Sequence, residues 1–138
     1  MNNLENAQKP EQKSPLIGVV GVCASGKSTL IRGLAAYGYR AKHIAQEHSY
    51  VKYMWRHITN PDVLIFLDVS YPMTIKRRQM SWLQADWEEQ KRRLSHAREH
   101  AHFYLHTDQH TEGEVLDEVV QFLLKFWANG QFYTTPHP

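Results

Sequence analysis

The sequence has very little cysteine and no long hydrophobic run. Cys23 is the only cysteine among 138 residues, which excludes an internal disulfide. A single thiol is typical of a reducing compartment, so we expect a cytoplasmic location. The longest apolar runs are about six residues, far short of the roughly 20 that a membrane-spanning helix needs. The sequence therefore predicts no membrane partner.

An excess of charge of one sign is also missing. The net charge is +2, which is too small to indicate a nucleic-acid or membrane surface. The length predicts one domain with one modest core, over residues 16–128. Residues 1–15 are polar and lack the apolar segment of a signal peptide, so they predict a disordered tail. Residues 129–138 predict a flexible C-terminal tail.

Within residues 16–128, apolar strand patterns alternate with helical ones. Strands are predicted at residues 16–20, 39–45, 62–69 and 101–106, because these runs are apolar or rich in β-branched and aromatic residues. Helices are predicted at residues 27–37 and 112–128, and over most of 72–100 with breaks near Met80 or Ser95. Residues 111–114, Thr-Glu-Gly-Glu, predict a capping box at the start of the last helix. A short helix after Ser49 would bury Val51, Met54, Trp55 and Ile58. This alternation predicts an α/β three-layer sandwich with a parallel sheet of about four to five strands.

A glycine-rich loop follows the first predicted strand directly. The loop is residues 21–28: Gly21, Val22, Cys23, Ala24, Ser25, Gly26, Lys27 and Ser28. In a Gly-x4-Gly-Lys-Ser loop the backbone N–H groups form a nest for anions, and the following helix adds partial positive charge. Lys27 can reach the β- and γ-phosphates of a nucleotide, Ser28 can ligate Mg²⁺, and Thr29 can offer a hydroxyl to the α-phosphate. Because the motif lies between a strand and a helix, it predicts binding of ATP with Mg²⁺.

Cysteine and histidine leave alternatives open. Cys23 is either a small filler of the loop or an oxidation-sensitive thiol in an electropositive site. The histidines His102 and His106 would share one face of the last strand. They lack cysteine partners and zinc-type spacing, so a metal site at these histidines stays open only as the less favoured alternative. The sequence has no Asn-Lys-x-Asp signature for guanine, which disfavours a regulatory GTPase.

Two later segments resemble the small kinases of the P-loop NTPase superfamily. Residues 60–72, followed by Arg77 and Arg78, are similar to the fourth strand and lid entry of thymidylate, shikimate and adenylate kinases. Residues 103–108 and 111–116 are similar to the last strand and C-terminal helix of that group. The resemblance implies a kinase that transfers the γ-phosphoryl group of ATP to a small-molecule acceptor. It also implies contacts from Thr107 and Asp108 to the base.

The basic segment at residues 72–100 has two interpretations. As a lid it would bring Arg77, Arg78, Arg92 and Arg93 over the phosphates, where they stabilise the charge of the transferred group. As a solvated helix face it would pair these arginines with nearby glutamates such as Glu89. The sequence alone does not separate the two interpretations.

The candidate carboxylate for Mg²⁺ or for the acceptor proton is Glu47. It follows the second predicted strand, and ligands of open α/β sheets gather at the carboxyl ends of strands. The alternative ligand is Asp68, which ends an apolar strand. A purely structural role for Glu47 is capping of the next helix.

The chain departs from the small kinases in having only residues 39–60 where they place the acceptor-binding region. The acceptor site is therefore abbreviated, supplied by a second subunit of a homodimer, or absent. If it is absent, the expected function is a nucleotide sensor that acts through a protein partner, or a simple ATPase.

Overall fold

The structure, a computed structural model, describes residues 14–78 and 81–128. Within these ranges four strands form one parallel sheet: β1 (Leu16–Gly21), β2 (Arg40–His43), β3 (Val63–Asp68) and β4 (Phe103–His106). Their order is β2-β1-β3-β4. The predicted α/β class with a parallel sheet is confirmed. The predicted tails fall outside the described residues, apart from Ser14 and Pro15.

Burial of the strands follows their position in the sheet. Every residue of β3 and all but the first residue of β1 are buried, as expected for central strands covered on both faces. The edge strand β4 alternates between half-buried and exposed residues. Because β1 is central, the glycine-rich loop opens in the middle of the carboxyl edge of the sheet.

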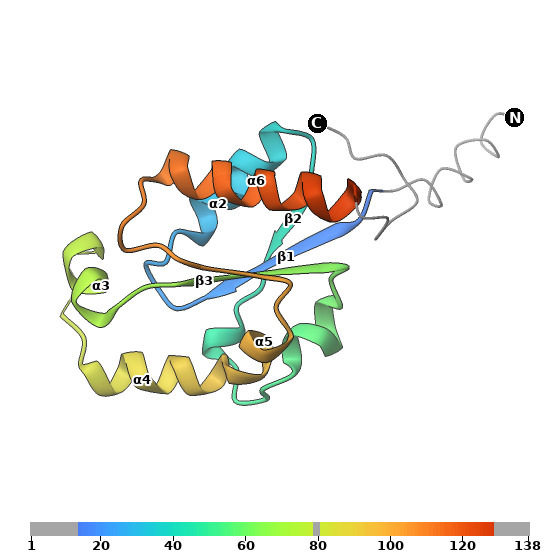
Figure 1. The fold of residues 1–138 in the computed structure, drawn as a ribbon. Helices are drawn as coiled ribbons and strands as arrows, with labels where there is room; N and C mark the ends of the chain where they lie inside the picture. Colours follow the sequence, from blue (N-terminus) through green and yellow to red (C-terminus); the bar gives the residue numbers. More distant parts are fainter. Residues whose placement is uncertain (1–13, 79–80, 129–138) are drawn as a thin grey trace, which may run out of the picture.

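Helices cover both faces of the sheet and produce three layers (Figure 1). On one face lie α2 (Lys27–Ala36) and α6 (Glu112–Ala128), and on the other lie α4 (Gln84–Arg93) and α5 (Ser95–His100). Odd-numbered residues of β3 such as Ile65 pack with α2 and α6, and even-numbered ones such as Phe66 pack with Leu94 and Ala97. This alternation is the period of two expected of a strand.

The N-terminus of α6 is the predicted capping box. Thr111 Oγ1 accepts a hydrogen bond from the Glu114 N–H at 3.1 Å, and Glu114 Oε1 accepts one from the Thr111 N–H at 2.9 Å. The reciprocal pair satisfies two N–H groups that a helix start otherwise leaves without partners. It therefore fixes where the chain turns from β4 into α6. No helix in the described part of the chain combines the length and apolar character needed to cross a membrane.

The segment between β2 and β3 differs from its prediction. A 3-10 turn, η2 (Gln46–His48), and a π-helical turn, η3 (Trp55–Thr59), replace the expected α-helix. Trp55 is buried, but Val51 and Ile58 are 38% and 70% exposed, so the predicted buried stripe is wrong. The side-chain amide of Gln46 explains the difference. It accepts from the Trp55 N–H and donates to the Val51 carbonyl, and so replaces helical hydrogen bonds with its own.

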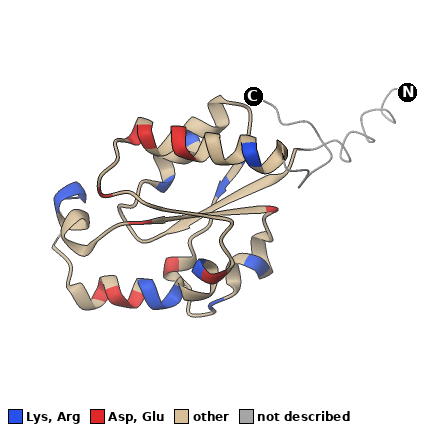
Figure 2. Cartoon of the chain, in the orientation of Figure 1, with Lys and Arg blue, Asp and Glu red and all other residues tan. Residues whose placement is uncertain are grey.

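The predicted long helix at residues 72–100 is divided. It consists of α3 (Tyr71–Arg78), α4 and α5, with a break between α4 and α5 beside the predicted position at Ser95. The other predicted break, Met80, lies outside the described residues. Acidic residues precede basic ones along α4, as Figure 2 shows, which matches the polarity of the helix dipole. Only α3 lies beside the carboxyl edge of the sheet, because α4 and α5 form one layer of the sandwich.

Candidate functional site

The carboxyl ends of all four strands contribute to one pocket of about 670 Å³. The chain leaves β1 toward the face of α2 and leaves β3 toward the face of α4, so β1 and β3 flank a topological switch point. The pocket is lined by residues 23–30, which follow β1. The other lining residues come from the end of β2 and the segment after it, from α3 after β3, and from the segment after β4; they are His43, Glu47, His48, Arg77, Arg78, Thr107, His110, Thr111, Glu112 and Val115. The predicted candidates at residues 23–28 of the glycine-rich loop and Glu47 therefore border the same pocket.

Two residues of the glycine-rich loop adopt left-handed backbone conformations. The φ angles are 68° at Ala24 and 104° at Gly26, which is the N-cap of α2. Left-handed residues in a short loop turn neighbouring N–H groups toward the same side, as in an anion nest. Gly21 has a different reason to be glycine, because an added Cβ would lie 2.3 Å from the Leu67 carbonyl oxygen of β3. The loop can therefore turn tightly against the sheet.

Lys27 points back under the loop. Its Nζ donates to the Gly21 carbonyl at 2.7 Å and to the Val22 carbonyl at 3.0 Å, and lies 3.1 Å from Glu47 Oε2. An ammonium group has three N–H donors, and the two carbonyls accept from two of them, whereas the contact with Glu47 is an ion pair. A phosphate at the loop would compete with Glu47 for the charge of Lys27.

Glu47 is buried among groups that can carry positive charge. The residue is 2% exposed, and its Oε2 lies 3.7 Å from His48 Nε2 and 3.9 Å from His43 Nε2. Its Oε1 is buried and has no hydrogen-bond partner among the described residues. Burial, followed by the Lys27 ammonium, lowers the pKa of His43, which favours a neutral imidazole. The site thus places a carboxylate, an ammonium and two imidazoles beside the glycine-rich loop.

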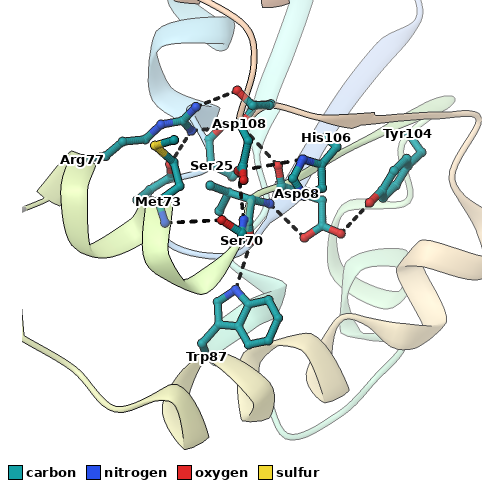
Figure 3. A network of polar contacts seen from close by, with 12 residues as sticks. Ser25, Asp68, Ser70, Met73, Arg77, Trp87, Tyr104, His106 and Asp108 are labelled. Carbon is teal, nitrogen blue, oxygen red and sulfur yellow. Dashed lines mark hydrogen bonds and ion pairs between the residues drawn. The ribbon is translucent and has the colours of Figure 1, made fainter.

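Asp68, the alternative metal ligand, is engaged elsewhere. Its carboxylate oxygens lie 3.0 and 2.9 Å from Lys91 Nζ. Its Oδ2 also accepts from the Tyr104 hydroxyl at 2.6 Å, a contact that Figure 3 shows. Its even position on β3 turns it toward α4, and it does not line the pocket. Burial alone would raise the pKa of Asp68, but the hydrogen bonds from Tyr104 and Lys91 outweigh it and lower the pKa. Asp68 therefore anchors α4 and β4 to the end of β3.

Arg77 connects α3 to both the glycine-rich loop and the end of β4. Its guanidinium donates to the Ala24 carbonyl at 3.0 Å, the Thr107 hydroxyl at 2.9 Å and the Thr107 carbonyl at 2.6 Å. Thr107 lines the pocket but is 1% exposed. Asp108 does not line the pocket; its Oδ1 accepts from the Ser70 N–H at 3.0 Å (Figure 3). Of the two residues predicted at the base, only Thr107 borders the pocket.

The four predicted lid arginines separate into two groups. Arg77 and Arg78 line the pocket, whereas Arg92 and Arg93 do not. Arg92 and Arg93 both pair with Glu89, and Arg93 also lies over the ring of Tyr50. These contacts match the solvated-face interpretation for Arg92, whose side chain is 62% exposed. The side chain of Arg93 is only 19% exposed and donates to the Glu47 carbonyl at 3.3 Å. The structure brings only the first pair to the glycine-rich loop.

The hydroxyls predicted to contact magnesium and phosphate both border the pocket. Ser28 lines it and is exposed, so its oxygen is accessible. Thr29 also lines it, and its hydroxyl donates to Glu112 Oε2 at 3.5 Å. Both hydroxyls come from the first turn of α2, where the helix N-terminus adds partial positive charge.

Sequence reasoning missed Gln90 and Lys91 on α4. Gln90 accepts from the Cys23 N–H at 3.0 Å and donates to Cys23 Sγ at 3.2 Å. These two hydrogen bonds connect α4 to the glycine-rich loop. Lys91 neutralises Asp68. A signal existed only for the second contact, since an aspartate at the end of a buried strand needs a cation.

A scan against protein-family models found no match for this chain, and neither did a search of curated proteins.

Proposed function

We propose that the chain binds ATP with Mg²⁺ in the pocket at the carboxyl edge of the sheet, as a small P-loop kinase does, and transfers the γ-phosphoryl group to a small-molecule acceptor. The observation that carries the proposal is the convergence of the glycine-rich loop, Lys27 and Glu47 on one pocket. The pocket volume of about 670 Å³ is in the range usual for small-molecule sites.

The loop supports phosphate binding through backbone and charge. The left-handed Ala24 and Gly26 shape the loop at the N-terminus of α2, where N–H groups lack helical partners. Lys27, Arg77 and Arg78 add three positive charges to the same pocket. A triphosphate would compete with Glu47 for the Lys27 ammonium, so nucleotide binding would break the ion pair between Lys27 and Glu47.

The residues present fit a magnesium ion. Mg²⁺ prefers oxygen ligands, and the pocket offers the exposed Ser28 hydroxyl and the Glu47 carboxylate with its unpartnered Oε1. When bound, Mg²⁺ supplies neutralisation of phosphate charge. Release of Lys27 from Glu47 would free the ammonium for phosphate and the carboxylate for the ion at the same moment.

Polar groups after β2 favour phosphoryl transfer over nucleotide sensing. Glu47, His43 and His48 line the pocket next to Lys27, and each can accept a proton from an acceptor hydroxyl. The lowered pKa of His43 favours the neutral form that a general base needs. A segment that served only as core would not place three such groups there.

The second candidate is a nucleotide-dependent module without an acceptor of its own, or a simple ATPase. It is favoured by the shortness of the segment between β2 and η3, where Gln46 and Trp55 are used for packing. A second subunit of a homodimer could also complete the acceptor site, since Tyr50 and Tyr53 on this segment are exposed.

Two measurements test the proposed function. In thermal melts, MgATP should raise the melting temperature, because a ligand that binds only the folded chain adds about 2.7 kcal/mol of stability at 100 times Kd. MgGTP should raise the melting temperature less than MgATP does. Phosphoryl transfer is then followed with labelled ATP against a panel of small hydroxyl and phosphate acceptors. Release of inorganic phosphate without labelled product would favour the ATPase, and binding without turnover would favour the sensor.

A further inference from the structure

A thiol, a carboxylate and an imidazole meet at the edge of the glycine-rich loop. Cys23 belongs to the loop after β1, whereas Glu47 and His48 belong to η2 after β2. One ligand atom from each, a sulfur, an oxygen and a nitrogen, lies within 4.8 Å of the other two. Within residues 14–78 and 81–128 this is the one group of three metal-ligating side chains that close together. The fold brings these three residues together, since Cys23 follows β1, and Glu47 and His48 follow β2.

Glu47 brings an unused ligand atom to this group. Its Oε2 pairs with the Lys27 ammonium at 3.1 Å, while its Oε1 is buried without a hydrogen-bond partner among the described residues. A buried carboxylate oxygen without a partner costs free energy, and native structures rarely leave one. A cation can therefore bind Oε1 without displacing Lys27 from Oε2.

We propose that Cys23, Glu47 and His48 bind a divalent cation of the zinc class, and that this cation and MgATP exclude each other from the pocket. The second part rests on the proposed function, whereas the metal site itself does not. Sulfur, nitrogen and oxygen ligands together favour zinc or its neighbours over magnesium, which takes oxygen ligands. Three protein ligands leave a fourth tetrahedral position open.

The distances require only a small contraction. Zinc bonds of 2.0–2.3 Å place tetrahedral ligand atoms about 3.3–3.8 Å apart. His48 Nε2 lies 3.7 Å from Glu47 Oε2, the other oxygen of the carboxylate whose Oε1 is the proposed ligand atom. Contraction of the whole group from 4.8 Å needs a movement of about 1 Å. A change of the His48 side-chain rotamer can supply much of this movement, since the side chain is 61% exposed.

Neighbouring residues hold the ligands in place. Gln90 donates to Cys23 Sγ at 3.2 Å and accepts from the Cys23 N–H at 3.0 Å, so the sulfur is oriented from α4. Outer-shell hydrogen bonds of this kind orient ligands and tune metal affinity.

Exclusion follows from shared residues. Glu47 is the carboxylate that the proposed function assigns to Mg²⁺, and Cys23 is part of the loop that would surround the phosphates. A cation held by the Cys23 thiolate and the His48 imidazole would also bind Glu47. Glu47 could then not join Ser28 as a ligand of Mg²⁺. A zinc-class ion would thus inhibit nucleotide binding.

The metal site is tested on the full chain without a histidine tag, stripped of metal and titrated with Co²⁺ as a spectroscopic probe for zinc. We expect one equivalent to bind with a thiolate-to-cobalt charge-transfer band, and Zn²⁺ to displace it. Cys23→Ser should abolish the band, and His48→Gln should weaken binding at least tenfold. We expect His48→Gln to fold normally, because the side chain of His48 is exposed.

His100→Gln is the matched control. His96 and His100 have ring centroids 4.2 Å apart on α5, so they are a rival pair of imidazoles away from the pocket. Binding should be unchanged in this variant. A cobalt complex without the thiolate band, or one that is lost in His100→Gln and kept in Cys23→Ser, would overturn the site.

Exclusion is tested by MgATP titrations with and without one equivalent of Zn²⁺. We expect at least tenfold weaker MgATP binding to the zinc-loaded chain, and no effect of Zn²⁺ on Cys23→Ser. Equal MgATP affinity in both forms would overturn the exclusion. Failure of the metal-free chain to bind MgATP would instead overturn the proposed function, and the cobalt spectrum would still decide the metal site.

Discussion

The Nζ atom of Lys27 lies 3.1 Å from the Oε2 atom of Glu47, and this ion pair joins the segments that follow β1 and β2. The two side chains are 7% and 3% exposed, so both charges are shielded from water. Removing one partner of a buried pair leaves the other charge uncompensated. The stability of the pocket therefore depends on the two residues that the proposed function uses most.

Glu47→Gln should change the magnesium dependence of ATP binding. The variant removes a negative charge beside the proposed phosphate site, so ATP without magnesium should bind about three- to tenfold more tightly. MgATP should no longer bind more tightly than free ATP, and the turnover rate should fall by a larger factor than the affinity. Isothermal titrations with ATP and MgATP, with turnover on the same preparation, check this. Unchanged coupling between Mg²⁺ and ATP would make Glu47 a structural residue only.

Gly21 and Gly26 should respond to alanine for different reasons. An added Cβ at Gly26 meets no atom within 4 Å, so Gly26→Ala is opposed only by the left-handed φ of 104°, at about 1–2 kcal/mol. At Gly21 the Cβ would lie 2.3 Å from the Leu67 carbonyl oxygen, so the backbone must move and the cost should reach about 3 kcal/mol. Urea denaturation measures both. A larger loss for Gly26→Ala than for Gly21→Ala would contradict the loop geometry.

Local patterns in the sequence were sufficient for the sheet, the glycine-rich loop and the capping box at Thr111. Each is encoded within a few neighbouring residues, by apolar runs or by fixed spacing. The segment after Ser49 was mispredicted because the side chain of Gln46 competes for the backbone groups of a later residue, Trp55.

Contacts between distant residues could not be read from such patterns. Gln90 supports Cys23 across 67 positions, and Lys91 neutralises Asp68 across 23. A periodic helix pattern predicts which face is polar but not which polar group it will meet. For the same reason the sequence did not separate Arg77, at the pocket, from Arg92, at the surface.

Arg77→Ala and Arg92→Ala form a matched pair. Arg77 makes three hydrogen bonds to Ala24 and Thr107, so its loss should cost about 1–3 kcal/mol and weaken MgATP binding. Arg92 makes a surface pair with Glu89, so its loss should change stability by less than about 0.5 kcal/mol. Arg77→Lys keeps the charge but not the forked geometry, and should resemble Arg77→Ala in thermal melts. Equal effects of Arg77→Ala and Arg92→Ala would argue against a role for Arg77 at the loop.

The Asp68 and Tyr104 pair should give stability a dependence on pH at both extremes. The folded pKa of Asp68 is lowered, so its contribution is present above the ordinary pKa near 4 and is lost as the pH falls through the folded value. Burial, followed by the bond to Asp68, raises the pKa of Tyr104 to about 12. Its contribution is therefore present below about pH 10 and is lost as the pH rises toward 12.

Asp68→Asn tests that relationship, since it removes the charge that both Tyr104 and Lys91 face. Urea denaturation from acid pH, below the ordinary pKa of an aspartate, up to about pH 12 should show a smaller loss of stability at both ends for the variant than for the wild type. At neutral pH the variant should be about 1–3 kcal/mol less stable, because Lys91 loses its partner. Parallel pH profiles for the two proteins would contradict the assignment.

The most direct test of nucleotide binding is MgATP titration calorimetry on the wild type and on the double variant Lys27→Ala/Glu47→Gln. The double variant removes both charges of the buried pair, so neither is left uncompensated, and a thermal melt confirms that it is folded. We expect the wild type to bind one MgATP and the variant to bind it about a hundredfold more weakly, a loss of about 2.7 kcal/mol. Affinity in the folded variant within twofold of the wild type, or no binding by either protein, would contradict the assignment of the glycine-rich loop as the phosphate site.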